Sequence, residues 1–359
     1  EKITIADIAS GKFAATMISE IRPVPNTDQY ACVSNDQTRI DLYSFKTGKQ
    51  VQTLFDVNNT QGESIKKVEG YIMSPDGSKL LIQTGTKKIY RRSFTAEYYI
   101  YTIRSRKLER LSVNGPQQSP VWSPDGHKIA FVRANNIYLV KLLYDNAESQ
   151  VTKDGKPNEI INGIPDWVNE EELSTSSSMV FNADGTMICW IKYDERAVKE
   201  YSLQLFKGSH PTHKEFDNYP GFYSYKYPKA GEVNAQVSAW AYDIQSHKTT
   251  LLQVPLDKDG YMPRIKATSE PNKILVFTLN RLQDNLTLYS VNPRTTLSQL
   301  LINEKADKYV KEESIEGVIV AQNSIILPSD RDGFMHLFEY SMNGTLKRKI
   351  GDGKFDITK

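Results

Sequence analysis

Short apolar runs separated by polar turn residues dominate the hydrophobic pattern of the chain. The runs are rich in Val, Ile, Leu, Tyr and Phe and are bounded by Asn, Asp, Gly and Ser. Clear examples are residues 79–83, 98–103, 128–132 and 136–140. β-Branched and aromatic residues in such runs are typical of strands. Long stretches with helical periodicity are nearly absent, so the pattern predicts an all-β protein.

One turn phrase recurs immediately before an apolar strand. It reads Ser-Pro-Asp-Gly at 74–77 and 123–126 and Asn-Ala-Asp-Gly at 182–185, with weaker echoes at 269–277 and 322–327. Proline presets φ, aspartate bonds its own backbone, and glycine supplies a positive φ. The three glycines are 49 and 59 residues apart, near the roughly 40–50 residues of one four-stranded propeller blade. The repeat predicts a β-propeller, because a β-sandwich, the alternative, has no reason to repeat the phrase.

Two segments interrupt the repeat. Residues 192–231 are polar and rich in tyrosine, and they are too many for a structureless loop in a compact domain. We therefore expect an extended hairpin arm inserted in a blade. Residues 87–97 are expected to form a basic hairpin that contains Arg91 and Arg92. Such side chains can simply solvate an edge strand, so local sequence leaves their function open.

Composition and charge limit the class of function. The chain has 359 residues and a net charge of +2, which gives no electrostatic case for a nucleic-acid partner. No apolar run approaches the roughly 18 residues of a membrane-spanning helix. The two cysteines, Cys32 and Cys189, cannot form a Cys-rich zinc site. The histidines show no metal spacing beyond His210 and His213, so neither a metal nor a cofactor is predicted.

The most informative local motif is Asp-Trp-Val-Asn-Glu-Glu-Glu-Leu at 166–173. Pro165 and Asp166 predict the start of a helix, with the aspartate as N-cap. Acidic residues near a helix N-terminus are favoured by the helix dipole and are usually solvated, which is one interpretation. The other is a cation site, because two adjacent carboxylates are stabilised by a shared cation. The α-ammonium of a peptide, with three N–H donors, is such a cation.

The glutamate motif resembles the double-glutamate motif of the dipeptidyl peptidase IV family, within the prolyl oligopeptidase class of serine peptidases. Further segments resemble that family in the same order along the chain: 90–101, 118–132, 135–138, 161–167, 227–234 and 329–337. The resemblance therefore covers nearly the whole chain. Asn169 departs from the pattern, because it stands where animal members of the family carry an aromatic residue.

The resemblance implies a substrate clamp. In this family the two later glutamates of the motif, here Glu171 and Glu172, hold the ammonium of the substrate. The hairpin arginine, here Arg91 rather than Arg92, holds the carbonyl of the second substrate residue. Because the N-terminus is fixed, cleavage falls after residue two, which implies release of Xaa-Pro or Xaa-Ala dipeptides. Two alternatives remain: a prolyl tripeptidyl peptidase, and a non-enzymatic periplasmic binding propeller.

The resemblance also implies a domain organisation. Residues 1–359 are expected to form a β-propeller region of about six of the family's eight blades, followed in the whole protein by an α/β-hydrolase domain. No Gly-x-Ser-x-Gly motif occurs, so we expect no catalytic residue and no activity in this chain alone. The expected partners are peptides with a free N-terminus, the hydrolase domain, and a second copy in a homodimer. The expected location is the bacterial periplasm or cell surface, or secretion, after removal of a signal peptide.

Overall fold

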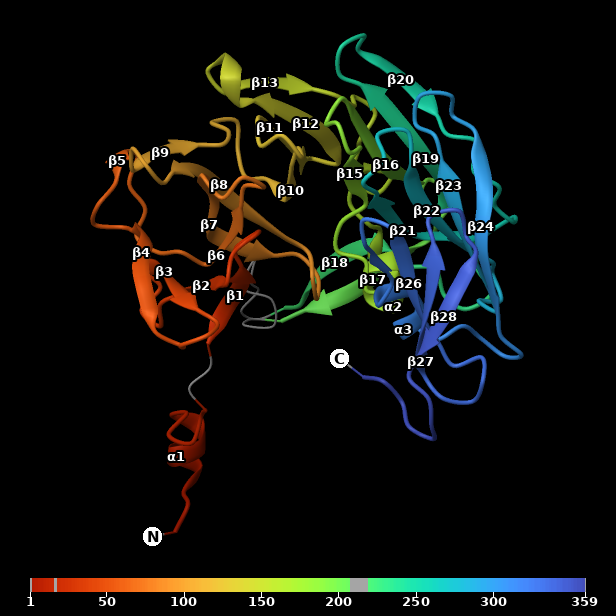
Figure 1. Ribbon diagram of the computed structural model, residues 1–359, viewed down its shortest axis with the longest axis horizontal. Coiled ribbons are helices and arrows are strands. Elements are labelled where there is room, and N and C mark those ends of the chain that lie inside the picture. The colour runs from red at the N-terminus through yellow and green to blue at the C-terminus, as the bar shows by residue number, and fades with distance from the viewer. Residues whose placement is uncertain (1, 16–17, 207–218, 359) are drawn as a thin grey trace. The chain divides into compact units, whose positions relative to one another are not determined.

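The computed structural model describes residues 2–15, 18–206 and 219–358. Most of the regular structure is β-strand, as the sequence predicts (Figure 1). The chain divides into two compact units: unit 1 comprises residues 1–86 and 97–111, and unit 2 comprises residues 87–96 and 112–359. The hairpin tip at 87–96 therefore belongs to unit 2, which also contains the glutamate motif. None of the described helices is long and apolar enough to cross a membrane.

Unit 1 contains a short helix and two sheets, in the strand orders β1-β2-β3-β4 and β5-β9-β8-β7-β6. Strands β1 to β4 pair antiparallel in order, as do β6 with β7 and β8 with β9, whereas β5 pairs with β9 in parallel. One apolar core, which includes Ile40, Phe55, Leu80 and Leu108, joins the two sheets. The elements are α1 (Ile5–Ala9), β1 (Ser19–Pro23), β2 (Gln29–Val33), β3 (Arg39–Ser44), β4 (Gln50–Asp56), β5 (Gln61–Gly62), β6 (Gly70–Met73), β7 (Lys79–Lys88), β8 (Phe94–Thr102) and β9 (Lys107–Arg110); the ends of β7 and β8 extend into unit 2.

Unit 2 contains, among its described residues, four sheets of four or five strands and one two-stranded ribbon. The first two sheets are formed by β10 (Gln118–Trp122), β11 (Lys128–Arg133), β12 (Asn136–Lys141) and β13 (Ala147–Gln150), and by β14 (Ile160–Asn162), β15 (Met179–Phe181), β16 (Met187–Asp194), β19 (Gln236–Asp243) and β20 (Lys248–Leu251). The last two are formed by β21 (Tyr261–Ala267), β22 (Ile274–Leu279), β23 (Asn285–Val291) and β24 (Ser298–Lys305), and by β25 (Ile319–Val320), β26 (Ser324–Ser329), β27 (His336–Ser341) and β28 (Leu346–Ile350). The short helices are η1 (Leu142–Tyr144), α2 (Trp167–Glu172) and α3 (Glu313–Glu316).

Successive sheets of unit 2 share apolar cores. One core joins Ile137 of β12 to Trp190 of β16 and Val276 of β22, and so it spans three sheets. A second core joins the sheet of Phe277 to the sheet of Phe338. Antiparallel four-stranded sheets that follow one another along the chain and pack against their neighbours are blades of a β-propeller. The predicted fold class is therefore confirmed.

The repeated turn phrase is followed by a strand each time, as predicted, and it connects two paired antiparallel strands: β6 and β7, β10 and β11, and β15 and β16. In the turn between β6 and β7, Gly77 has a φ of +70°, and Gly126 repeats this with +68°. The serine that opens the phrase makes hydrogen bonds within the turn that the sequence does not reveal. Ser74 is fully buried; its Oγ donates to Asp76 Oδ1 at 2.6 Å and accepts from Lys79 N at 2.9 Å. The serine thus closes the turn from the inside.

A two-stranded ribbon is inserted between β16 and β19. It consists of β17 (Glu200–Leu205) and β18 (Gly221–Lys226), which pair antiparallel. We call β17 and β18 together the arm ribbon; both strands lie within the segment in which the sequence predicts an arm. Residues 207–218, including the candidate pair His210 and His213, lie outside the described residues.

Candidate functional site

Helix α2 begins at the residue that the sequence predicts as its N-cap. Asp166 Oδ1 accepts hydrogen bonds from Asn169 N at 2.9 Å and from Asn169 Nδ2 at 2.7 Å. Asp166 is buried, and burial raises the pKa of its carboxyl group. Because successive residues of a helix point about 100° apart, the three glutamates that follow face different surroundings.

Glu170, the first of the three glutamates, is buried and holds the hairpin tip. Its Oε1 accepts the backbone N–H groups of Arg92 and Ser93, each at 2.7 Å. The side chain is 1 % exposed, so both bonds lie largely away from solvent. Hydrogen bonds from backbone N–H groups to a carboxylate are stronger than those to a neutral acceptor. Glu170 therefore fixes the hairpin tip against α2.

Glu171 forms an ion pair with Arg91; the resemblance to the family assigns both residues to one site but does not predict this direct contact. Arg91 Nε donates to Glu171 Oε2 at 2.7 Å, and the Arg91 backbone N–H reaches Glu171 Oε1 at 3.3 Å. The carboxylate side chain is 14 % exposed, whereas the arginine side chain is 72 % exposed. Within the described residues only Nε of the guanidinium is engaged, so its terminal nitrogens face solvent.

Glu172 and Arg92 take other directions. Glu172 is exposed, and its side chain makes no hydrogen bond or ion pair with any part of the chain that the structure describes. Arg92 Nη2 donates to Ser174 Oγ at 2.5 Å, and Ser174 Oγ in turn donates to Glu312, next to α3. Of the three predicted site residues, the structure thus brings Arg91 and Glu171 into contact and leaves Glu172 open to solvent.

An aromatic cluster lies between α2, the hairpin tip and the base of the arm ribbon. The ring centroids of Trp167 and Tyr227 are 4.3 Å apart, those of Trp167 and Tyr225 are 6.1 Å apart, and those of Tyr90 and Tyr225 are 5.8 Å apart. The tyrosine-rich segment is evident in the sequence, but its place at the site is not. The available signal was the alternation of Tyr223, Tyr225 and Tyr227, which puts all three rings on one face of an extended chain.

Another buried acid, Glu195, lies at the start of the arm. Glu195 is 6 % exposed. Burial, with the nearby Asp166 carboxyl group, raises the pKa of Glu195 to about 8, although Lys226 opposes the shift. The sequence analysis did not select Glu195, because nothing in the local sequence distinguishes it from neighbouring surface acids. At neutral pH Glu195 is therefore mainly uncharged.

The arrangement suits a ligand with one cationic and one carbonyl group. Glu171 and Glu172 are adjacent, and both have exposed surface that a cation can reach. The exposed terminal nitrogens of Arg91 can donate hydrogen bonds to an acceptor of a ligand. A peptide N-terminus offers an ammonium and carbonyl oxygens a few bonds apart, so it matches both requirements.

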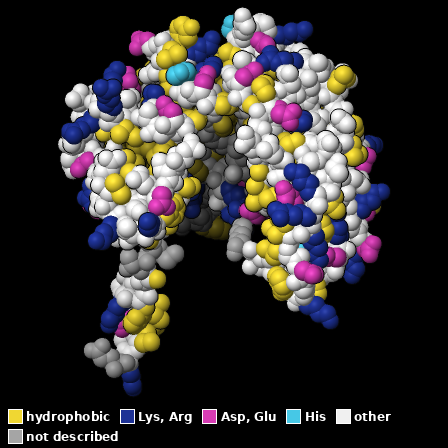
Figure 2. Space-filling model, in the orientation of Figure 1, with side chains coloured by type: hydrophobic (Ala, Val, Ile, Leu, Met, Phe, Trp, Pro, Cys, Tyr) yellow, Lys and Arg dark blue, Asp and Glu magenta, His cyan; other side chains and the backbone are white. Residues whose placement is uncertain are grey.

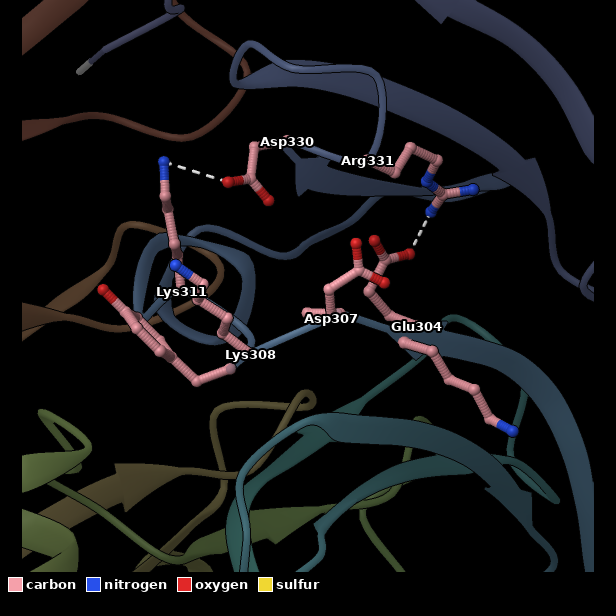
Figure 3. A pocket seen from close by; sticks show the side chains of 9 residues that line it. Glu304, Asp307, Lys308, Lys311, Asp330 and Arg331 are labelled. Carbon is pink, nitrogen blue, oxygen red and sulfur yellow. Dashed lines mark hydrogen bonds and ion pairs between the residues drawn. The ribbon is translucent and has the colours of Figure 1, made fainter.

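A separate cavity of about 350 Å³ lies between the ends of β24 and β26 (Figure 3). Four of its charged side chains form ion pairs: Arg331 pairs with Glu304, and Lys311 pairs with Asp330 at 3.0 Å. Tyr309 also lines it. Basic and acidic side chains are likewise interspersed over the face shown in Figure 2. Among the described residues there is no group of three or more His, Cys, Asp or Glu that could hold a metal ion.

Comparisons with known proteins identify the family and the fold of the chain. The family model described as the dipeptidyl peptidase IV (DPP IV) N-terminal region matches residues 74–359. The crystal structure of Porphyromonas gingivalis dipeptidyl peptidase 4 is similar with a TM-score of 0.93 and 34 % identity, covering 100 % of this chain and 50 % of that chain. A protein of Emericella nidulans named "Probable dipeptidyl-aminopeptidase B" is 36 % identical over 238 residues, which are 64 % of this chain and 26 % of the relative. The dipeptidyl-aminopeptidase B of Aspergillus niger is 33 % identical over 242 residues, with the same coverage. The chain therefore spans half or less of the proteins that it matches.

Proposed function

The chain belongs to the dipeptidyl peptidase IV N-terminal region family, and from this premise we propose that its propeller recognises the free N-terminus of a peptide substrate. The observation that carries the proposal is the ion pair between Arg91 and Glu171, which lie 80 residues apart in the sequence. With the arginine 72 % exposed, such a pair contributes only about 0–1 kcal/mol to stability. Its geometry therefore supports a ligand-binding role better than a purely stabilising one.

The clamp acts through charge-assisted hydrogen bonds. The substrate ammonium donates to Glu171 and Glu172, and Arg91 donates from its terminal nitrogens to the carbonyl of the second substrate residue. Each such bond contributes on the order of 1.5–3 kcal/mol when it is shielded from water. Acetylating the substrate amine removes the positive charge and two of its three donors, so the clamp selects free N-termini.

The clamp also sets the length of the product. With the N-terminus held, the reacting bond lies at a fixed distance from it, and we propose that the whole protein releases Xaa-Pro or Xaa-Ala dipeptides. The nucleophile belongs to an α/β-hydrolase domain of the same protein, outside this chain. We further propose a homodimer that uses the arm, and a periplasmic or surface location.

The test uses the full-length protein and Gly-Pro p-nitroanilide. We expect Glu171→Gln and Glu172→Gln each to lower kcat/KM by roughly tenfold or more, which corresponds to one charge-assisted bond. Glu270→Gln is the matched control, because Glu270 is another exposed acid of unit 2 that pairs with one basic residue, Lys273. Labelling by a fluorophosphonate should stay unchanged in all variants, since it reports only the nucleophile.

Three outcomes decide against the proposal in different ways. Activity that is indifferent to Glu171 and Glu172 removes the clamp. Tripeptides in place of dipeptides among the products correct the length that the clamp sets. Absence of fluorophosphonate labelling in the full-length protein favours a binding propeller without peptidase activity.

A further inference from the structure

Tyr225 lies where the arm ribbon, helix α2 and the hairpin tip meet. Its ring centroid is 6.1 Å from that of Trp167, the first residue of α2, and 5.8 Å from that of Tyr90, which directly precedes Arg91. Both separations fall in the range of favourable aromatic pairs. Tyr225 is only 8 % exposed, although the strand paired with it, β17, is open to solvent along nearly all its length.

The base of the arm ribbon is held independently of the clamp. Lys226 Nζ donates to Val198 O at 2.7 Å, and Tyr227 N donates to Lys199 O at 3.0 Å. Tyr227 also packs against Trp167, with ring centroids 4.3 Å apart, and its ring lies 5.9 Å from that of Tyr225. The base therefore presents two rings to α2 in a fixed position, and only Tyr225 also reaches the hairpin tip through Tyr90.

We propose that Tyr225 is a positioning residue that holds Arg91 and Glu171 at the spacing a peptide N-terminus requires. This inference rests on the proposed function, because it assigns Tyr225 to the same site. Trp167 stands about one helical turn before Glu171 in α2, and Tyr90 is bonded directly to Arg91. A single side chain thus contacts both of the elements that carry the ion pair.

The pKa of Tyr225 also indicates that its side chain lies near Glu171. Burial and the neighbouring tyrosines raise the pKa of Tyr225, and the Glu171 carboxylate adds to this shift. Tyr223 supports the arrangement from the side, because it stacks on Tyr225 at 5.6 Å and hydrogen-bonds to Tyr90. Without the Tyr225 ring, the hydrogen bonds of Glu170 still connect the hairpin tip to α2. The contacts of that ring with Trp167 and Tyr90, which we propose set the spacing of the two elements, are lost.

The experiment uses the full-length protein, Gly-Pro p-nitroanilide, and the variants Tyr225→Leu, Tyr225→Phe, Glu171→Gln and the Tyr225→Leu, Glu171→Gln double variant. Loss of the ring contacts with Trp167 and Tyr90 predicts a roughly tenfold higher KM for Tyr225→Leu, with kcat and the fluorophosphonate labelling rate nearly unchanged. Tyr225→Phe keeps the ring and should restore the wild-type KM. In the Glu171→Gln background, Tyr225→Leu should add little, because its effect acts through the clamp.

Phe222→Leu is the matched control. Phe222 is an aromatic residue of the same strand, is 68 % exposed, and has no ring contact with another described residue. Its substitution should leave KM unchanged. Thermal unfolding of each variant accompanies the kinetics, and Tyr225→Met, which fills the space without a ring, replaces the leucine variant if that variant does not fold.

The outcomes separate this inference from the proposed function. If Glu171→Gln has no effect, the proposed function fails and the inference falls with it. If Glu171→Gln weakens activity but Tyr225→Leu leaves KM unchanged, only the positioning role is overturned. It is also overturned if the two effects multiply in the double variant, or if labelling slows in parallel with activity.

Discussion

Replacing Glu195 with glutamine should remove much of the pH dependence of local stability around α2. Glu195 is 6 % exposed, and its pKa is raised to about 8 from the ordinary value of 4.5. The unfolded chain loses this proton as the pH passes 4.5, whereas the folded chain keeps it until about pH 8. Between these values the folded state binds more protons, so stability falls as pH rises.

The size of the effect follows from the shift. Each unit of pKa difference is worth about 1.4 kcal/mol, so the loss between pH 4.5 and pH 8 amounts to roughly 3–5 kcal/mol. Below pH 4.5 both states are protonated, and above pH 8 both are ionised, so the dependence should flatten on either side. Glutamine is neutral throughout, and Glu195→Gln should therefore be more stable than the wild type near pH 8 and show a much weaker slope.

Hydrogen exchange of the peptides that cover α2 and residues 194–199 measures this locally. Exchange is followed from pH 5 to pH 9 on the intact protein and corrected for the intrinsic dependence of exchange on pH. Glu200→Gln is the control, because Glu200 is an exposed acid of the adjacent strand. Equal slopes for the wild type and Glu195→Gln would refute the argument that Glu195 is a buried, protonated acid.

Two further substitutions test how the site and the fold are held. Glu170→Ala should free the hairpin tip, because the backbone N–H groups of Arg92 and Ser93 lose their acceptor. Hydrogen exchange of these two amides should accelerate roughly 30-fold, equivalent to about 2 kcal/mol. Glu170→Gln, which keeps an acceptor, should retain most of the protection. Unchanged exchange would contradict the anchoring role. Gly344→Ala should lower the unfolding temperature more than Gly333→Ala. Both glycines have a positive φ, so both substitutions strain the backbone. Only at position 344 would the added Cβ also clash, because it would lie 2.3 Å from Leu301 O, whereas a Cβ at 333 meets nothing within 4 Å. Equal losses would mean that backbone strain alone decides.

The sequence was sufficient to predict features whose interactions join residues close together in the chain. The Ser-Pro-Asp-Gly turns and the N-cap at Asp166 depend on residues a few positions apart, and both are observed as predicted. The propeller followed from the repetition of the turn. The ion pair between Arg91 and Glu171 joins residues 80 apart in the sequence. The resemblance to a family placed both residues in one site, but the direct contact was not predicted.

The remaining features depend on tertiary packing. Three identical glutamates in succession give no indication that Glu170 is buried, Glu171 is paired and Glu172 is exposed, because helix geometry and the incoming hairpin decide this. Burial of Glu195 and the contacts of Tyr225 similarly require the arm to fold back on α2. The alternating tyrosines at 223–227 mark one face of a strand, but not the partner of that face.

The central claim is that Glu171 and Arg91 bind the free N-terminus of a peptide, and the most direct test is the affinity of the dipeptide product. Gly-Pro and N-acetyl-Gly-Pro are titrated calorimetrically into the full-length wild type and the Glu171→Gln variant. The wild type should prefer the free amine by roughly tenfold or more, and the variant should lose most of this preference. An equal cost of acetylation in both proteins would contradict it.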